Sequence, residues 1–194
     1  MDLRFCHPTT GLLVGGTGAG KTYFMKRLIE NRHLMFNVQF DRIVWHFTEW
    51  QSIYADLKQK CEVEFYEGVP TLDEFPSDHG PLLLCLFPKG LRQISLNCSV
   101  CVIFKTSRDL AQIRSFCMQV NPSDWRALLE AYQDATVAPH SYLLFDFSYK
   151  QSDHMRLRAC IFPGENTVVY IPKKHYKSGV TRELPLVADR HGHE

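Results

Sequence analysis

One short segment near the start of the chain constrains the fold more than any other. It matches the pattern G-x-x-x-x-G-K-[ST] in full and consists of Gly15, Gly16, Thr17, Gly18, Ala19, Gly20, Lys21 and Thr22. An apolar run at 11–14 precedes it, and apolar residues spaced four apart follow it, as in Phe24 and Leu28. A glycine-rich turn between a strand and a helix is the setting in which this pattern forms a phosphate-binding loop. The sequence therefore predicts an α/β fold of the P-loop NTPase kind, with residues 15–22 as its Walker A motif.

The residue types in this segment suit the phosphates of a nucleotide. Glycines let the backbone turn tightly and direct successive N–H groups inward, which makes a concave anion site. The N-terminus of the following helix adds unpaired N–H groups and the positive end of its dipole. In such a loop Lys21 reaches the β- and γ-phosphates and assists catalysis, while the Thr22 hydroxyl holds Mg²⁺. The sequence thus predicts binding of ATP with Mg²⁺ by residues 15–22.

The rest of the chain alternates between strand-like and helix-like segments. Strands are expected at 43–47, 63–66, 82–87, 99–105, 141–148, 155–162 and 167–171, and helices at 23–34, 50–60, 108–120 and 123–134. This alternation favours a mainly parallel central sheet with flanking helices. We expect residues 1–174 to form one P-loop ATPase domain and residues 175–194 to form a polar C-terminal tail.

Composition narrows the class of protein without adding a site. The 194 residues carry a net charge of +1, so no global charge attracts nucleic acid. No apolar run approaches the ~20 residues of a membrane helix, and we expect no membrane partner. The seven cysteines show no framework spacing and are interpreted as reduced, which predicts a nuclear or cytoplasmic location. Cys98 and Cys101 are interpreted as two small thiols in a buried strand rather than as a zinc or redox site.

Several further segments together resemble one protein family. They are His7-Pro8, 41–45, 49–51, 63–68, 94–97, 104–109, 129–136, 142–146, 156–158 and 161–165. In this order they look like the genome-packaging ATPase of Polinton (Maverick) transposons and adintovirus-like viruses, a family of the HerA/FtsK group. The likeness runs roughly from Arg4 to Lys174. It implies a homo-oligomeric ring, expected to be a hexamer, that couples ATP hydrolysis to packaging of double-stranded DNA into a viral capsid.

The chain departs from this family where the Walker B acids are expected. Family members have an apolar strand that ends in two acidic residues, then a helix and a second strand that ends in a polar sensor. Here Leu82-Leu83-Leu84 runs directly into Cys85 and into a segment, 86–90, that follows the sensor in the family. The resemblance therefore implies a P-loop fold shortened by one strand and one helix. Because the missing acids hold Mg²⁺ and polarise the attacking water, we expect nucleotide binding to persist and hydrolysis to be impaired.

The shortened apolar run at 82–87 is expected to form a hybrid strand. Six consecutive apolar residues on an exposed sheet edge would invite aggregation. We therefore expect this strand to be buried in the centre of the sheet, directly beside the strand at 12–14.

Two residues outside the loop are weaker candidates for catalysis. Asp146 follows the apolar run 142–145 and matches a loose Walker B pattern, but the family order favours a late core strand that ends in a solvated Asp. Arg108 follows an expected strand and is a candidate arginine finger or sensor. The competing interpretation is a local pairing of Arg108 with Asp109 or another nearby acid.

Three functions are compatible with these features. The first is a subunit of a DNA-packaging motor, and the second is an inactive nucleotide-binding remnant of that family. The third is a small-molecule P-loop kinase, although the chain shows no arginine-rich lid of the kind that closes over phosphates in such kinases.

Overall fold

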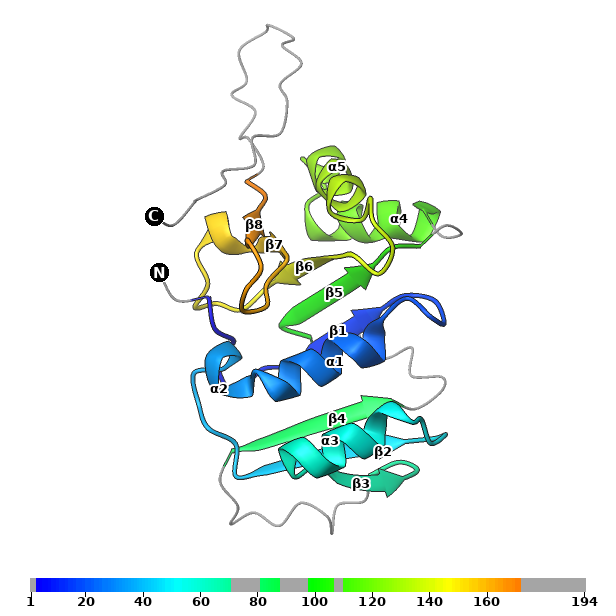
Figure 1. Cartoon of the computed structure of the whole chain (residues 1–194). Helices are drawn as coiled ribbons and strands as arrows, with labels where there is room; N and C mark the ends of the chain where they lie inside the picture. Colours follow the sequence, from blue (N-terminus) through cyan, green and yellow to red (C-terminus); the bar gives the residue numbers. More distant parts are fainter. Residues whose placement is uncertain (1–2, 71–80, 88–97, 107–109, 172–194) are drawn as a thin grey trace, which may run out of the picture. The chain divides into compact units, whose positions relative to one another are not determined.

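The computed structural model describes residues 3–70, 81–87, 98–106 and 110–171 (Figure 1). The predicted features at Arg108 and at 175–194 lie outside these residues. Contacts divide the chain into two compact units, one made of Met1–Pro8 and Tyr23–Asn97 and the other of Thr9–Thr22 and Cys98–Glu194. The single ATPase domain expected for 1–174 stays a prediction. The observed architecture is mixed α/β, with two sheets and flanking helices.

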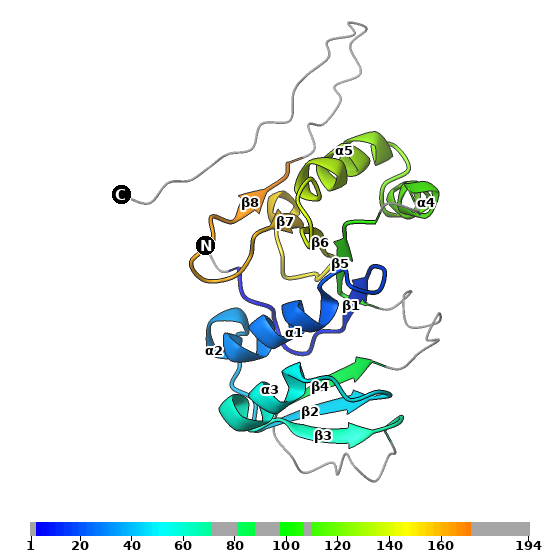
Figure 2. The ribbon, with the colours of Figure 1, turned by 45° about the vertical axis from the view of Figure 1, so that its right-hand side comes forward.

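The first unit contains a three-stranded parallel sheet with the order β3-β2-β4 (Figure 2). Its elements are α1 (Lys21–Glu30) from its third residue onward, α2 (Arg32–Met35), β2 (Arg42–Phe47), α3 (Ile53–Cys61), β3 (Glu64–Glu67) and β4 (Leu82–Phe87). The central strand β2 has four successive buried residues, as expected of a strand covered on both faces. Its Trp45 is fully buried, and the ring of Tyr54 on α3 lies 5.1 Å from it, centroid to centroid. Ile29 of α1 belongs to the same apolar cluster, so α1 and α3 both contribute to the core of this unit together with β2.

The second unit contains a five-stranded sheet with the order β1-β5-β6-β7-β8. Its elements are β1 (Gly11–Val14), β5 (Val100–Phe104), α4 (Leu110–Val120), α5 (Trp125–Ala135), β6 (Tyr142–Asp146), the 3₁₀ helix η3 (Asp153–Met155), β7 (Leu157–Ala159) and β8 (Val168–Val169). Only β1 and β5 are parallel, and the three later pairs are antiparallel. The sheet is therefore mixed rather than mainly parallel. No α-helix separates β6, β7 and β8, and short connections without a helical crossover join antiparallel neighbours.

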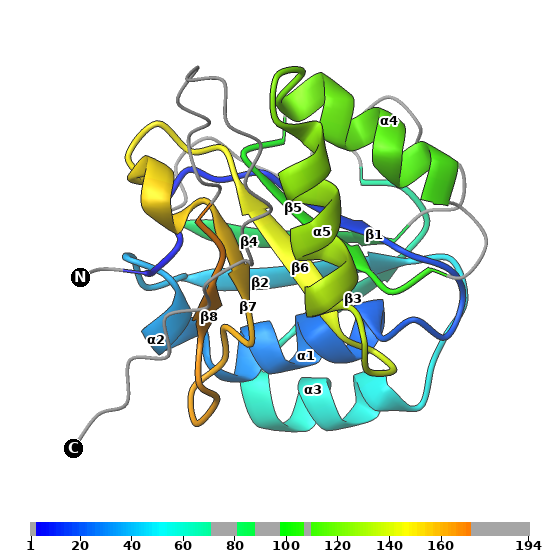
Figure 3. The ribbon, with the colours of Figure 1, turned by 90° about the horizontal axis from the view of Figure 1, so that it is seen from above.

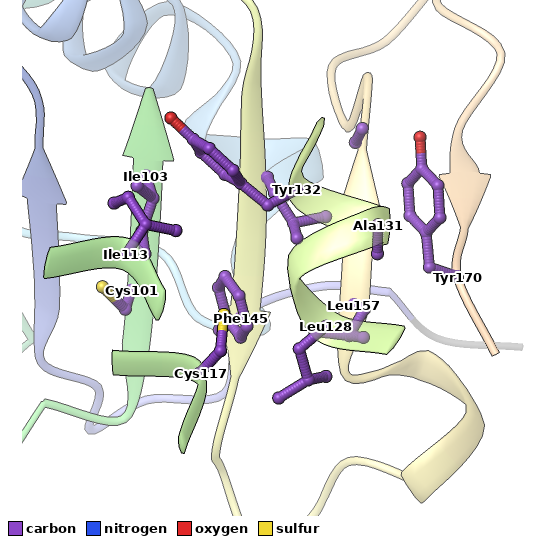
Figure 4. Packing of buried hydrophobic residues seen from close by; sticks show 12 residues of the cluster. Cys101, Ile103, Ile113, Cys117, Leu128, Ala131, Tyr132, Phe145, Leu157 and Tyr170 are labelled. Atoms are coloured by element: carbon purple, nitrogen blue, oxygen red, sulfur yellow. The ribbon is translucent and has the colours of Figure 1, made fainter. Parts of the chain in front are cut away.

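The core of the second unit lies between this sheet and two helices. Strand β5 lies between β1 and β6, and all five of its residues are buried. Helices α4 and α5 cover one face of the sheet (Figure 3). Cys101 of β5 and Phe145 of β6 pack there with Cys117 of α4 and Tyr132 of α5 (Figure 4). This packing holds β5 firmly, and β5 in turn supports β1 and the loop that follows it.

The position expected for the strand at 82–87 is wrong. This strand is β4, and all six of its residues pair in parallel with β2, from Arg42 opposite Leu82 to Phe47 opposite Phe87. Within the described residues it lies at an edge of the three-stranded sheet, and the neighbour of β1 is β5. The place beside β1 is filled by β5, and the register of this pair runs from Gly11 opposite Val100 to Val14 opposite Ile103. The hybrid-strand account is therefore not supported.

Candidate functional site

The predicted phosphate loop lies between a strand and a helix, as its sequence pattern requires. Strand β1 ends at Val14 and α1 begins at Lys21. Between them Gly18 has a φ of +77° and Gly20 a φ of +105°. Residues other than glycine rarely adopt such backbone conformations. The Ala19 N–H donates to the Gly16 carbonyl oxygen at 3.2 Å and closes the turn. The loop thus depends on glycine at two positions for its conformation.

The first glycine is required for a different reason. A Cβ atom at Gly15 would lie 2.9 Å from the Cβ of Phe104 and 3.1 Å from the Cβ of Ala19. Both atoms are attached directly to the backbone, so neither can swing aside without moving β5 or the loop. A Cβ atom at Gly16 would meet nothing within 4 Å, and its φ lies outside the left-handed region. Packing therefore requires glycine at position 15, whereas at position 16 there is room for a larger side chain.

Lys21 folds back over the loop. Its Nζ donates to the carbonyl oxygens of Gly15 at 2.7 Å and of Gly16 at 2.8 Å. Partial burial lowers the pKa of this amine from its usual value, because burial disfavours the charged form. Phosphate oxygens bound in the loop would replace these neutral carbonyls with charged partners and favour the ammonium form. Thr22, which is half-buried, follows in the first turn of α1.

Phe104 and His140, which are far from the loop in sequence, lie against it in the structure. The sequence analysis did not identify either residue as part of the site. The Cβ of His140 and the ring of Phe104 lie closest to Gly20, at 3.4 and 3.6 Å from the position of an added Cβ. His140 itself has a φ of +62°. Its segment is held by Lys105, whose N–H donates to Ser141 O at 3.0 Å and whose Nζ donates to Val137 O. No local pattern marks His140, because its place beside the loop depends on the pairing of β5 with β6.

Asp146 is not brought to the phosphate loop. It pairs with Val100, which pairs with Gly11, so it lies at the end of the sheet opposite to the loop. At about 3.3 Å per residue, the four steps along β5 from Val100 to Phe104 amount to roughly 13 Å. Asp146 is also buried, with an exposed fraction of 2 %, and its carboxylate accepts hydrogen bonds from Arg158 and from Ser148. The side chain has a structural role in an ion pair, so the solvated Asp expected as the alternative is not observed either.

The residues that the structure describes contain no cluster of three or more His, Cys, Asp or Glu side chains that could hold a metal ion. With a nucleotide in the loop, the Thr22 hydroxyl, the phosphates and water would offer the hard oxygen ligands that Mg²⁺ accepts. The candidate Arg108 lies outside the described residues.

No family model, curated protein or solved structure matches this chain. In the part of the chain that the structure describes, no helix is long and apolar enough to cross a membrane.

Proposed function

We propose that this chain binds ATP with Mg²⁺ through residues 15–22. The observation that carries the proposal is a complete G-x-x-x-x-G-K-[ST] pattern in a loop whose glycines have the required backbone angles and close contacts. The loop leads directly into α1, and the first N–H groups of an α-helix have no partner within the helix, so they suit an anion. Lys21 supplies a positive charge at the same place, already within hydrogen-bonding distance of the loop backbone. Together these groups suit the β- and γ-phosphates of a nucleotide.

We further propose that hydrolysis is slow. No Asp or Glu occurs between Asp78 and Asp109, a stretch that contains both β4 and β5. The strand beside β1 is followed by Lys105 rather than by an acid, and Asp146 is engaged with Arg158 at the other end of the sheet. An ATPase needs a group that orients the attacking water and helps to hold the metal. The function that we propose is therefore nucleotide binding with impaired ATP hydrolysis, in a relative of the DNA-packaging motors.

The resemblance extends the proposal to double-stranded DNA and to a homo-oligomeric, hexameric ring. Blocks that span most of the chain in family order support this extension. The net charge of +1 means that any contact with DNA phosphates would come from a local basic patch.

Substitution of two adjacent glycines tests the binding proposal. We expect Gly15→Ala to weaken binding of a fluorescent ATP analogue about tenfold, since overpacking of this kind costs ~1–3 kcal/mol. Gly16→Ala should change the dissociation constant less than about twofold, because the added methyl group meets no atom. Equilibrium titrations in the presence of Mg²⁺, with circular dichroism as a check on folding, give both values. Equal affinities for the two variants would contradict the proposed loop geometry.

A phosphate-release assay tests the proposed slow turnover. We expect release from ATP to equal the background measured with a Lys21→Ala variant, both with and without double-stranded DNA. The physical reason is that neither β5 nor the two residues that follow it include an Asp or Glu. Release that exceeds this background and rises with added DNA would show that the chain is a working motor subunit.

A further inference from the structure

The N-terminal end of β5 contains a bulge that changes which side chains share a face. The N–H groups of Ser99 and Val100 both donate to the carbonyl oxygen of Thr10, each at 2.9 Å. Two successive amides on one acceptor mean that one extra residue is inserted, which shifts the alternation of side chains by one. The Ser99 hydroxyl fixes the bulge, since it contacts the Thr9 hydroxyl at 2.8 Å and accepts from the Thr10 N–H at 2.9 Å.

The bulge places two cysteines on the same face of the sheet. In a regular strand, residues 98 and 101 would point to opposite faces. Here Cys101 belongs to the apolar cluster under α4 and α5, and Cys98 packs against that same cluster. Cys101 is buried, with an exposed fraction of 1 %, whereas Cys98 is half-buried and accessible to small reagents.

The shared position also affects the protonation of the two thiols. Hydrogen bonding from the Cys101 thiol favours the Cys98 thiolate and lowers the pKa of Cys98 to about 7. It raises the pKa of Cys101, which burial raises further, so Cys101 keeps its proton. The pair therefore consists of an accessible thiol that ionises easily and a buried thiol that keeps its proton, and both pack in one apolar cluster on the same face of the sheet.

We propose that Cys98 and Cys101 form an oxidisable dithiol, in which Cys98 reacts with hydroperoxides and Cys101 resolves the product. The Cys98 thiolate attacks one oxygen of the hydroperoxide, the O–O bond breaks, and the products are the Cys98 sulfenic acid and hydroxide or an alkoxide. The Cys101 thiol then attacks the Cys98 sulfur, an S–S bond forms, and the sulfenic oxygen leaves as water with the Cys101 proton. The net change is a two-electron oxidation of the dithiol and a two-electron reduction of the peroxide.

Other cysteines of the chain provide internal references. Cys117 and Cys85 are buried, and burial raises the pKa of these thiols to about 11 and about 12. Both are therefore expected to stay unreactive in the folded protein. Cys160 is exposed and reports how fast an accessible thiol reacts. The pair also lies at the end of β1 and β5 opposite to the phosphate loop, so this inference does not depend on nucleotide binding.

Alkylation of the wild-type protein with iodoacetamide, followed by peptide mass spectrometry, tests the nucleophile. We expect the alkylation rate of Cys98 to rise with a midpoint near pH 7, whereas an ordinary cysteine has a pKa of about 8.5. Cys117 should stay unmodified at every pH at which the protein is folded. A Cys98 midpoint near that of an ordinary thiol would overturn the proposal without any variant.

Treatment with hydrogen peroxide tests the resolving step. In the wild type we expect a disulfide between Cys98 and Cys101, identified in their common peptide by the loss of two hydrogens. In Cys101→Ser, which keeps a hydroxyl donor but no resolving thiol, we expect a Cys98 sulfenic acid that dimedone traps. Wild-type protein in which Cys98 is oxidised no faster than Cys160, or in which no Cys98–Cys101 disulfide forms, would overturn the proposal.

Discussion

Replacement of Arg158 with methionine is expected to lower the free energy of unfolding by about 3–5 kcal/mol. Arg158 on β7 and Asp146 on β6 are both buried, with exposed fractions of 1 % and 2 %. The Arg158 guanidinium donates to Asp146 Oδ2, and burial lowers the pKa of Arg158 while Asp146 partly opposes that shift. Methionine fills a similar volume but leaves the Asp146 carboxylate without its cationic partner. A loss of this size is a large part of the stability of an ordinary domain.

Urea denaturation followed by circular dichroism measures this effect, and a double variant provides the control. Asp146→Leu combined with Arg158→Met removes both charges, so most of the lost stability should return. The two Ser148 hydrogen bonds to Asp146 are also lost in the double variant, so recovery will be incomplete. An Arg158→Met protein within about 1 kcal/mol of the wild type would show that the pair is not a buried structural link.

The elements of this chain follow closely from local sequence patterns. The apolar runs predicted at 43–47, 82–87 and 99–105 are strands β2, β4 and β5, and the helical spacing near 23–34 gives α1 and α2. The loop at 15–22 was predicted in its strand–helix setting. These predictions succeed because the spacing of apolar residues and the position of glycines act over a few residues.

The arrangement of strands could not be predicted in the same way. The runs at 82–87, 100–104 and 142–146 are all apolar enough to lie beside β1, and pairing depends on the whole chain. The structure places β5 beside β1 and pairs β4 with β2. Strands β6, β7 and β8 pair antiparallel and are joined by short connections. The spacing of apolar residues within a strand does not reveal the direction in which it pairs.

The site was predicted only as far as it is local. His140 contacts Gly20 because β6 runs antiparallel to β5 and begins at the loop end of the sheet. Because β6 runs in this direction, Asp146 lies at the opposite end of the sheet. The sequence pattern alone had made Asp146 a Walker B candidate. The interpretation of Cys98 and Cys101 as small thiols of a buried strand did not predict that both lie on one face of the sheet, because the bulge depends on pairing with Thr10 rather than on the cysteines themselves.

Replacement of Lys21 with alanine is expected to weaken nucleotide binding about 10- to 100-fold. Hydrogen bonds from a charged donor contribute ~1.5–3 kcal/mol each, and a factor of ten corresponds to ~1.4 kcal/mol. The Lys21 ammonium already lies 2.7 and 2.8 Å from two loop carbonyls, where it can exchange these for phosphate oxygens. Alanine keeps the helix, since it is the best helix former, and removes only the charged group.

Lys26 on the same helix is the matched control. Its Nζ lies 2.6 Å from Glu30 Oε1 in a pair spaced four residues apart, and such pairs stabilise helices by only ~0.2–0.5 kcal/mol. Lys26→Ala removes the same charge from α1 but lies beyond the phosphate loop. We therefore expect its affinity for the nucleotide to stay within about twofold of the wild type.

The most direct measurement of the central claim is an equilibrium titration of a fluorescent ATP analogue, with Mg²⁺, into the wild type, Lys21→Ala and Lys26→Ala proteins. If residues 15–22 bind the phosphates, the wild type and Lys26→Ala proteins will bind with similar dissociation constants, and Lys21→Ala will bind about 10- to 100-fold more weakly. Unlabelled ATP should displace the analogue from the first two proteins. Equal dissociation constants for the wild type and Lys21→Ala, or no binding to the folded wild type, would contradict the account.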